Sequence, residues 1–328
     1  MGPMEGFLID RLGPRRIMWT GMFFFGLGMV VFSRIDSLYG YYGAFMLMAV
    51  GSSLGGFLMI MSTINNWFRR RRTLAMALAQ TGMSVGALII VPILAWAQTE
   101  FGWRAAALGS GLSIWAVGLP IALFMRQHPE PYGHSPDGIP PEKANQPEGE
   151  IRPDSSTYAV NYTIGEALRT SNFWLMSFGH SLAFLVISAA SLHQFPLMEE
   201  GIGLSHVAAA SVVSIIAAVN FVGQLTGGFL GDRTDKRLVI FLGMAGSSIG
   251  IVVLALATSY FHAALFGVIH GFCWGIRSPI TSSLRGDYFG RKSFATISGT
   301  SNLILSLGGI FGPLFAGYMA DIQGNYTL

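Results

Sequence analysis

Nine long apolar runs dominate the sequence, and each is about as long as a helix must be to cross a membrane. About 20 apolar residues in a helix span the roughly 30 Å of hydrocarbon in a bilayer. Since 52% of the residues are hydrophobic and only 11% are charged, a soluble domain of this size would have more apolar side chains than its core can bury. The sequence therefore predicts an all-α protein in a lipid bilayer, with spans over residues 17–33, 40–64, 74–98, 104–125, 172–198, 204–230, 238–258, 261–284 and 294–320.

Glycine is frequent, with 42 residues, and several glycines recur at four-residue spacing within the apolar runs. Such spacing puts the glycines on one side of a helix, where the lack of a side chain lets a second helix approach closely. Helix contact surfaces are therefore expected at Gly267, Gly271 and Gly275, and at Gly308 and Gly312.

Basic residues gather in every second connection between the runs. Positively charged connections stay on the cytoplasmic side of a membrane, so these predict one orientation for the chain. The protein is expected to be a multi-pass protein of the inner (cytoplasmic) membrane, with the polar, proline-rich stretch 126–171 as a cytoplasmic linker. The basic connections contain Arg11, Arg15 and Arg16; Arg69 to Arg72; Arg233, Lys236 and Arg237; and Arg285, Arg291 and Lys292.

The two halves of the chain repeat one another. Gly6, Asp10 and Arg11 recur as Gly228, Asp232 and Arg233, an offset of 222 (228 minus 6). Trp67-Phe68 before arginines matches Tyr288-Phe289 at an offset of 221, and Gly102 matches Gly324 at 222. The repeat predicts two similar helical bundles, 1–125 and 172–328, joined by the linker 126–171. Each half should contain the same number of spans. One N-terminal span, most of a second and a last C-terminal span are therefore expected to lie outside this chain, so that the full protein would have twelve helices and helices 1, most of 2 and 12 would be missing here.

The repeated segment resembles a known signature. Two copies of a glycine, acid and arginine pattern, the second weaker, resemble the loops between helices 2 and 3 and between helices 8 and 9 of the major facilitator superfamily. The resemblance implies two pseudo-symmetric bundles that alternate access to a central cavity, with gating by these loops. Their acid and bases are expected to pair, and Gly13-Pro14 to turn the chain. The matching residues are Gly6, Asp10, Arg11, Gly13, Arg15, Arg16, Gly228, Asp232 and Arg233.

Other segments resemble the monocarboxylate and oxalate/formate branch of that superfamily. They are Trp67-Phe68, Gly102-Trp103-Arg104, His193-Gln-Phe-Pro196 and Asp287-Tyr-Phe-Gly-Arg291. Transporters of that branch commonly carry charged residues in helix 8 or helix 11, whereas the corresponding runs 204–230 and 294–320 have none. The resemblance therefore does not identify the substrate.

Arg277 is expected to be the one Lys or Arg inside an apolar run. All 17 Asp and Glu residues fall in connections or at the ends of runs, so no carboxylate within a run is available to neutralise it. An unpaired charge at membrane depth is costly, and the planar guanidinium group suits a carboxylate in two parallel hydrogen bonds. A small organic anion is the predicted partner. A gating contact with backbone carbonyls, an extension toward the cytoplasm, or a pair with an acid in a helix outside this chain remain alternatives.

Several polar residues could complete a substrate site around Arg277. His270, Trp274, Arg277 and Thr281 recur at spacings of four, three and four, which puts them on one stripe of a helix. His270 could touch substrate or exchange a proton, or be a buried hydrogen-bonded histidine. His193, which belongs to the segment that resembles the family, is a further candidate. The other candidate substrate-binding residues, each of which also fits a role in holding helices together, are Asn220, Gln224, Gln80 and Asn302.

The enzyme-like patterns in the sequence do not predict an enzyme. Three serine-hydrolase-like patterns, at Gly51 to Gly55, Gly82 to Gly86 and Gly246 to Gly250, fall within expected helices and fit helix packing. The sequence has no nucleotide-binding loop and no metal-ligand spacing, so neither a cofactor nor a nucleic-acid partner is predicted. Secondary transport is expected, with a proton in symport or a counter-anion in exchange. An exporter of neutral or amphipathic compounds, a non-transporting receptor and an intramembrane hydrolase are the alternatives.

Overall fold

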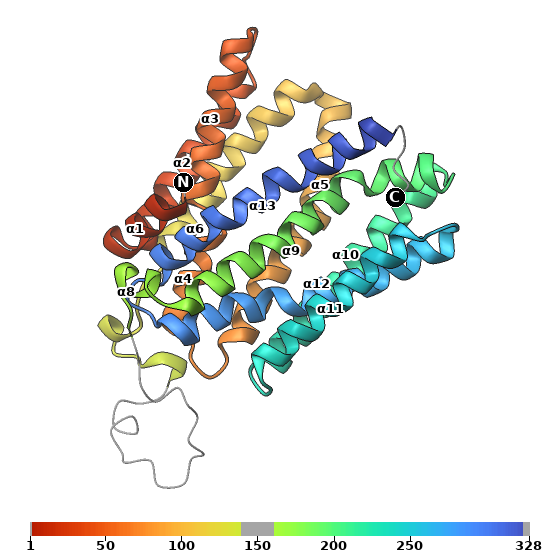
Figure 1. Cartoon of the computed structure of the whole chain (residues 1–328). Coiled ribbons are helices and arrows are strands. Elements are labelled where there is room, and N and C mark those ends of the chain that lie inside the picture. Colours follow the sequence, from red (N-terminus) through yellow and green to blue (C-terminus); the bar gives the residue numbers. More distant parts are fainter. Residues whose placement is uncertain (1, 139–160, 324–328) are drawn as a thin grey trace. The chain divides into compact units, whose positions relative to one another are not determined.

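The computed structural model describes residues 2–138 and 161–323, and there the regular structure is entirely helical (Figure 1). Gly324 of the repeat and residues 139–160 of the predicted linker lie outside these ranges. The chain divides into two compact units. One contains Met1–Arg70, Val85–Ile164 and Gly286–Thr300, and the other contains Arg71–Ser84, Gly165–Arg285 and Ser301–Leu328. The bundle boundaries expected from the repeat stay a prediction.

The main helices have the following bounds: α1 Gly2–Leu12, α2 Pro14–Phe32, α3 Leu38–Leu54, α4 Phe57–Trp67, α5 Arg72–Ser113, α6 Leu119–Leu123, α8 Ile164–Leu168, α9 Ser171–Pro196, α10 His206–Gly231, α11 Lys236–Ala255, α12 Tyr260–Phe289 and α13 Phe294–Gln323. Short π-helical segments at Ile114–Gly118 and Leu197–Gly201 adjoin α6 and α9, and single 3-10 turns form at Glu130–Tyr132 and Pro136–Gly138.

Within the described residues, seven helical segments are long and apolar enough to cross a membrane: Pro14–Phe32, Leu38–Trp67, Arg72–Leu123, Ser171–Gly201, His206–Gly231, Lys236–Ala255 and Phe294–Ile322. The sequence predicted nine spans, and the difference has two causes. Two predicted runs fall in the single segment Arg72–Leu123, which is interrupted by a non-helical Gly102 (φ 79°). The 30-residue helix α12 is long enough to span a bilayer, but Arg277 and its histidines make it less apolar than the others.

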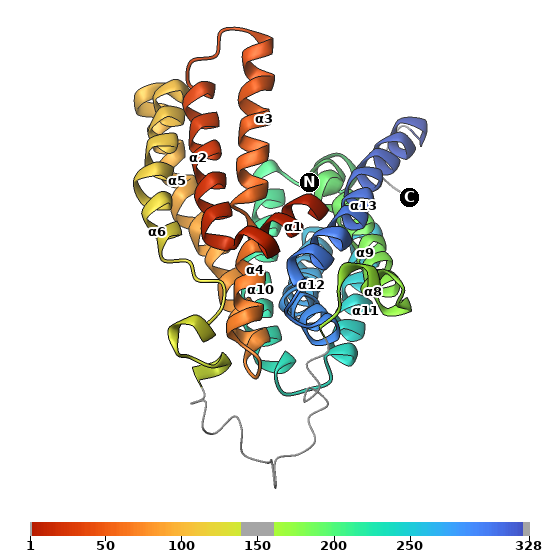
Figure 2. The ribbon, with the colours of Figure 1, turned by 90° about the vertical axis from the view of Figure 1, so that its left-hand side faces the viewer.

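The first unit begins with a sharp turn between α1 and α2. Gly13 adopts φ 82°, a left-handed conformation that costs glycine little, and Pro14 occupies the first turn of α2. The expected turn at Gly13-Pro14 is therefore confirmed. Helices α2 and α3 then run side by side (Figures 1 and 2). A Cβ at Gly21 of α2 or Gly51 of α3 would meet backbone atoms of the other helix.

In the second unit, glycines hold α12 against α10. A Cβ at Gly271 would lie 2.7 Å from the backbone oxygen of Ile216, and one at Gly275 would overlap the backbone oxygen of Asn220. On α13, Gly308 and Gly312 face backbone oxygens of α9 in the same way. The helix contacts predicted from glycine spacing are thus confirmed at these four positions.

Replacement of Gly275 by alanine is expected to destabilise the protein. Because the new methyl group meets backbone rather than a flexible side chain, α10 and α12 must separate, at a cost of about 1–3 kcal/mol. Gly179→Ala is a matched control, since Gly179 lies within α9 and a Cβ there meets nothing within 4 Å. In detergent, the apparent Tm should fall for Gly275→Ala and be unchanged or slightly raised for Gly179→Ala. Equal Tm values would contradict the close packing.

Candidate functional site

The two signature acids each bind the N-terminus of a helix. Asp10, near the end of α1, accepts hydrogen bonds from the backbone N–H groups of Ala295 (3.3 Å) and Thr296 (2.8 Å) and from the Thr296 hydroxyl (2.6 Å), at the start of α13. Asp232, directly after α10, accepts hydrogen bonds from the N–H groups of Thr73 (2.9 Å) and Leu74 (3.0 Å), at the start of α5.

These contacts are copies of one another. The two acceptors, Asp10 and Asp232, are 222 positions apart in the sequence (232 minus 10). Their donors, Thr296 and Leu74, are also 222 positions apart (296 minus 74). The positive end of a helix dipole and its unpaired N–H groups stabilise a carboxylate, typically by about 0.3–2 kcal/mol. The expected pairing of Asp10 with a base is therefore wrong for the described residues, because helix N–H groups take the role predicted for the arginines.

Two of the four signature arginines lie over aromatic rings. The guanidinium of Arg11 lies 5.8 Å from the ring centre of Phe7, and that of Arg233 lies 3.4 Å from the ring centre of Phe229. Each ring is one helical turn before its arginine, and the two rings are again 222 positions apart. Sequence reasoning missed these rings, although both follow the signature glycine directly. Arg11, Arg15, Arg16 and Arg233 are all exposed.

The signature glycines let the helices approach. A Cβ at Gly6 would overlap the backbone of Ala295, and a Cβ at Gly228 would lie 2.5 Å from Cβ of Ala77 and 3.2 Å from Cα of Leu74. Both glycines therefore allow the close contact in which the neighbouring acid reaches the helix N-terminus.

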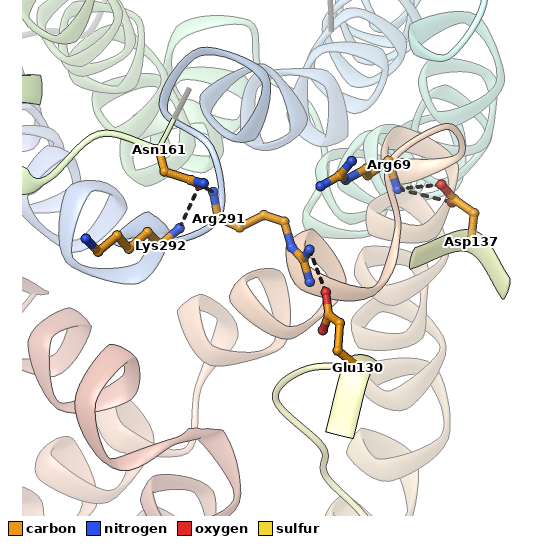
Figure 3. A network of polar contacts seen from close by, with 6 residues as sticks. All are labelled: Arg69, Glu130, Asp137, Asn161, Arg291 and Lys292. Atoms are coloured by element: carbon orange, nitrogen blue, oxygen red, sulfur yellow. Dashed lines mark hydrogen bonds and ion pairs between the residues drawn. The ribbon is translucent and has the colours of Figure 1, made fainter. Parts of the chain in front are cut away.

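A polar network in the first unit joins linker residues to the connection between α12 and α13 (Figure 3). Arg291 donates from Nη1 to Oε1 of Glu130 (2.9 Å), and the N–H groups of Arg291 and Lys292 donate to Oδ1 of Asn161 (3.0 and 3.3 Å). Burial tends to raise the pKa of Glu130, but the hydrogen bond and charge of Arg291 outweigh it and lower the pKa. The pair of Glu130 and Arg291 therefore contributes its full stability at pH values above the ordinary pKa of glutamate. That stability is lost as the pH falls through the lowered pKa of Glu130.

A second linker contact lies after α4. The carboxylate of Asp137 accepts a hydrogen bond from the backbone N–H group of Arg69 (3.1 Å) (Figure 3). It also accepts one from the N–H group of Arg70 (3.0 Å). Two of the predicted basic connections are thus held by polar residues of the predicted linker, one by Glu130 and Asn161 and the other by Asp137.

Arg277 is the largest fully buried side chain in the described part of the chain, with 2% of its surface exposed. Its guanidinium carbon lies 4.2 Å from the ring centre of Trp274, one turn earlier on α12, and that ring stacks on Phe184 of α9. Among the described residues no carboxylate pairs with Arg277, and its Nη1 has no hydrogen-bond partner. The predicted intramembrane charge is therefore buried and lacks an acid among these residues.

Arg285 is a second buried arginine on α12, with 7% exposed. It donates from Nη2 to Nδ1 of His180 on α9 (3.1 Å) and from Nη1 to Oδ1 of Asn302 on α13 (3.4 Å). Its Nε has no hydrogen-bond partner within residues 2–138 and 161–323. The assignment of Arg285 to a basic connection is wrong, because α12 continues to Phe289 and includes Arg285. That Arg277 is the one Lys or Arg within an apolar span stays a prediction. A sequence signal existed, since Arg285 continues the stripe through Trp274 and Thr281 by four further residues.

The remaining predicted site residues make contacts between or along helices. Nδ1 of His270 lies 2.9 Å from Oγ of Ser247, and Nε2 of His193 lies 3.1 Å from the backbone oxygen of Pro313. Both histidines thus join neighbouring helices of the second unit.

The predicted amides are partly satisfied. Asn220 donates to the backbone oxygen of Gly271 (3.4 Å) and accepts a hydrogen bond from Gln224 (2.9 Å), while Gln80 accepts one from Ser278 (2.6 Å). Oε1 of Gln224 and Nε2 of Gln80 are buried without a partner among the described residues. Asn220 and Gln80 therefore contact α12 directly, and Gln224 contacts it through Asn220.

Long apolar helices and glycine-packed contacts between them indicate a polytopic membrane protein. The family model "Major Facilitator Superfamily" matches residues 1–313. The chain belongs to the Major Facilitator Superfamily, and the resemblance seen in its signature loops is confirmed.

Known proteins support this membership. The chain is 25% identical over 334 residues to Monocarboxylate transporter 13 of Rattus norvegicus, covering 99% of this chain and 71% of the relative. It is 26% identical over 342 residues to the Hexuronate transporter of Escherichia coli (strain K12), covering 99% and 76%. The crystal structure of the E. coli fucose:proton symporter matches with a TM-score of 0.72 at 16% identity, over 100% of this chain and 82% of that chain. The likeness to that structure shows the fold alone.

Proposed function

We propose that the protein is a secondary active transporter that moves small organic anions, monocarboxylates or dicarboxylates, by alternating access. The observation that carries the proposal is the buried guanidinium of Arg277, which has no acid partner and an unpartnered Nη1 among the described residues. The protein would lie in the inner (cytoplasmic) membrane, with its linker on the cytoplasmic side.

Electrostatics favour an anionic partner. Removal of a charged group from water costs several kcal/mol unless an opposite charge and hydrogen bonds compensate. The face of Trp274 offsets part of that cost for Arg277, since a cation over an indole ring gains about 0.5–2 kcal/mol. A carboxylate would supply the remaining charge and accept the hydrogen bond that Nη1 does not make.

Two relatives carry names that fit this chemistry. One is a monocarboxylate transporter and the other a hexuronate transporter, and both monocarboxylates and hexuronates bear a carboxylate group. Both relatives cover nearly the whole chain, although identity is only 25–26%. Their names support a carboxylate-bearing substrate.

The two acid-to-helix contacts would serve as the inner gate. Asp10 and Asp232 each attach the end of one helix to the start of another, and each contact consists of a few hydrogen bonds. Such small contacts can form and break within a transport cycle, because each contributes only about 0.5–3 kcal/mol.

Uptake of radiolabelled carboxylates into proteoliposomes tests the proposal. Uptake of an acid such as lactate is expected, with none for the uncharged lactamide, because the amide lacks the charge that Arg277 requires. An imposed inward proton gradient should accelerate uptake in symport, whereas a preloaded anion should accelerate it in exchange. Equal movement of acid and amide would favour the alternative of an exporter for neutral compounds.

A further inference from the structure

A second buried guanidinium lies in the same helix as Arg277. Arg285 comes eight residues after Arg277 on α12, and its side chain contacts α9 and α13 through His180 and Asn302. Both partners are uncharged acceptors in these contacts. Among the described residues no carboxylate compensates either arginine, and each retains one buried N–H nitrogen without a partner, Nη1 of Arg277 and Nε of Arg285.

Arg285 contacts α9 directly, whereas Arg277 is joined to α9 through the ring of Trp274. His180 accepts the hydrogen bond from Arg285, and Phe184, four residues further on, stacks on the Trp274 ring that lies under Arg277. Residues four apart on a helix lie on the same side, about 6 Å apart along its axis.

We infer that Arg285, with His180 and Asn302, forms a second anion-binding group beside Arg277, so that the substrate is a short dicarboxylate with one carboxylate for each guanidinium. This inference rests on the proposed transport of organic anions.

Charge balance favours two carboxylates over one. A monocarboxylate at Arg277 would leave Arg285 buried with only neutral partners, whereas a dicarboxylate neutralises both groups and reduces their mutual repulsion. A short dicarboxylate such as succinate can supply both charges, because its two carboxylates are several ångströms apart. Asn302 and His180 would keep the fork of Arg285 in place, since each holds one of its terminal nitrogens.

Succinate and butyrate are suitable probes, because they have equally long carbon chains and differ in the second carboxylate. In proteoliposomes, the wild-type protein is expected to take up succinate with an apparent KM at least about tenfold lower than that for butyrate, since an unpaired buried charge strongly weakens binding. Arg285→Gln should raise the KM for succinate about tenfold or more and change that for butyrate less than about threefold. Arg277→Gln should impair both.

Arg285→Lys separates binding from folding. Lysine keeps the charge, although it lacks the planar fork, so part of the preference for succinate should return. Equal loss of succinate and butyrate uptake in Arg285→Gln would assign Arg285 a structural role and overturn the inference. If Arg285→Gln does not fold, the KM values of the wild-type protein for succinate and butyrate still test the inference. If the wild-type protein takes up butyrate but not succinate, the inference of a dicarboxylate substrate is wrong and the proposed function stands. If it takes up neither acid, both the inference and the proposed function are wrong.

Discussion

Arg277→Gln is expected to abolish anion uptake in a protein that still folds. Glutamine preserves much of the length and some of the hydrogen bonding of arginine but has no charge, so the substrate loses its buried ion pair. Loss of one partner of such a pair costs about 2–5 kcal/mol, which corresponds to roughly 30-fold or more in affinity. Initial rates of labelled carboxylate uptake in proteoliposomes, measured over a range of concentrations, will show this loss.

A matched control is available on the surface. Arg104 pairs with Asp36 (2.8 Å) where both side chains are more than half exposed, at 54% and 85%. An exposed ion pair contributes only about 0–1 kcal/mol, so Arg104→Gln should leave uptake nearly unchanged. Wild-type uptake in Arg277→Gln would assign Arg277 a structural role and remove the anion proposal, while the transporter fold would stand.

Asp10→Asn combined with Asp232→Asn is expected to slow transport strongly. Asparagine retains one acceptor oxygen but lacks the negative charge that the helix N-termini of α13 and α5 stabilise. The loss of about 1–2 kcal/mol at each equivalent contact would destabilise the closed inner gate and reduce the turnover rate about tenfold or more in the double variant. Each single variant should show an intermediate rate.

The pattern of kinetic change tests whether these contacts gate. Since neither acid lies at Arg277 in the proposed mechanism, the maximal rate should fall while the KM for the carboxylate changes little. Asp36→Asn is the control, because Asp36 is exposed and outside the repeat. A normal maximal rate in the double variant would show that the two contacts do not control access.

The sequence was sufficient for the class of fold, because hydropathy and spacing determine which segments enter a membrane. The four glycine contacts on α12 and α13 followed from the same reasoning, since only glycine permits such approach between helices. The constant offset of 222 also predicted that the two signature loops are equivalent, and the contacts of Asp10 and Asp232 are indeed copies.

The partners within the site could not be predicted in the same way. Asp10 was expected to meet a base, because charges of opposite sign lie near it in the sequence, whereas its partners are the N–H groups of Ala295 and Thr296, far along the chain. Every residue except proline has a backbone N–H group, so the sequence does not show which of these groups will bind a side chain. Arg285 was assigned to a connection because basic residues follow it, although its four-residue spacing from Thr281 on the polar stripe indicated that the helix continues.

An experimental structure of the protein with a transported carboxylate bound tests the central claim most directly, by measuring the distance from the carboxylate oxygens to Arg277. The account predicts hydrogen-bond distances of about 2.7–2.9 Å between those oxygens and the guanidinium nitrogens of Arg277. A guanidinium of Arg277 paired instead with a carboxylate of the protein itself, with the substrate bound elsewhere, would contradict it.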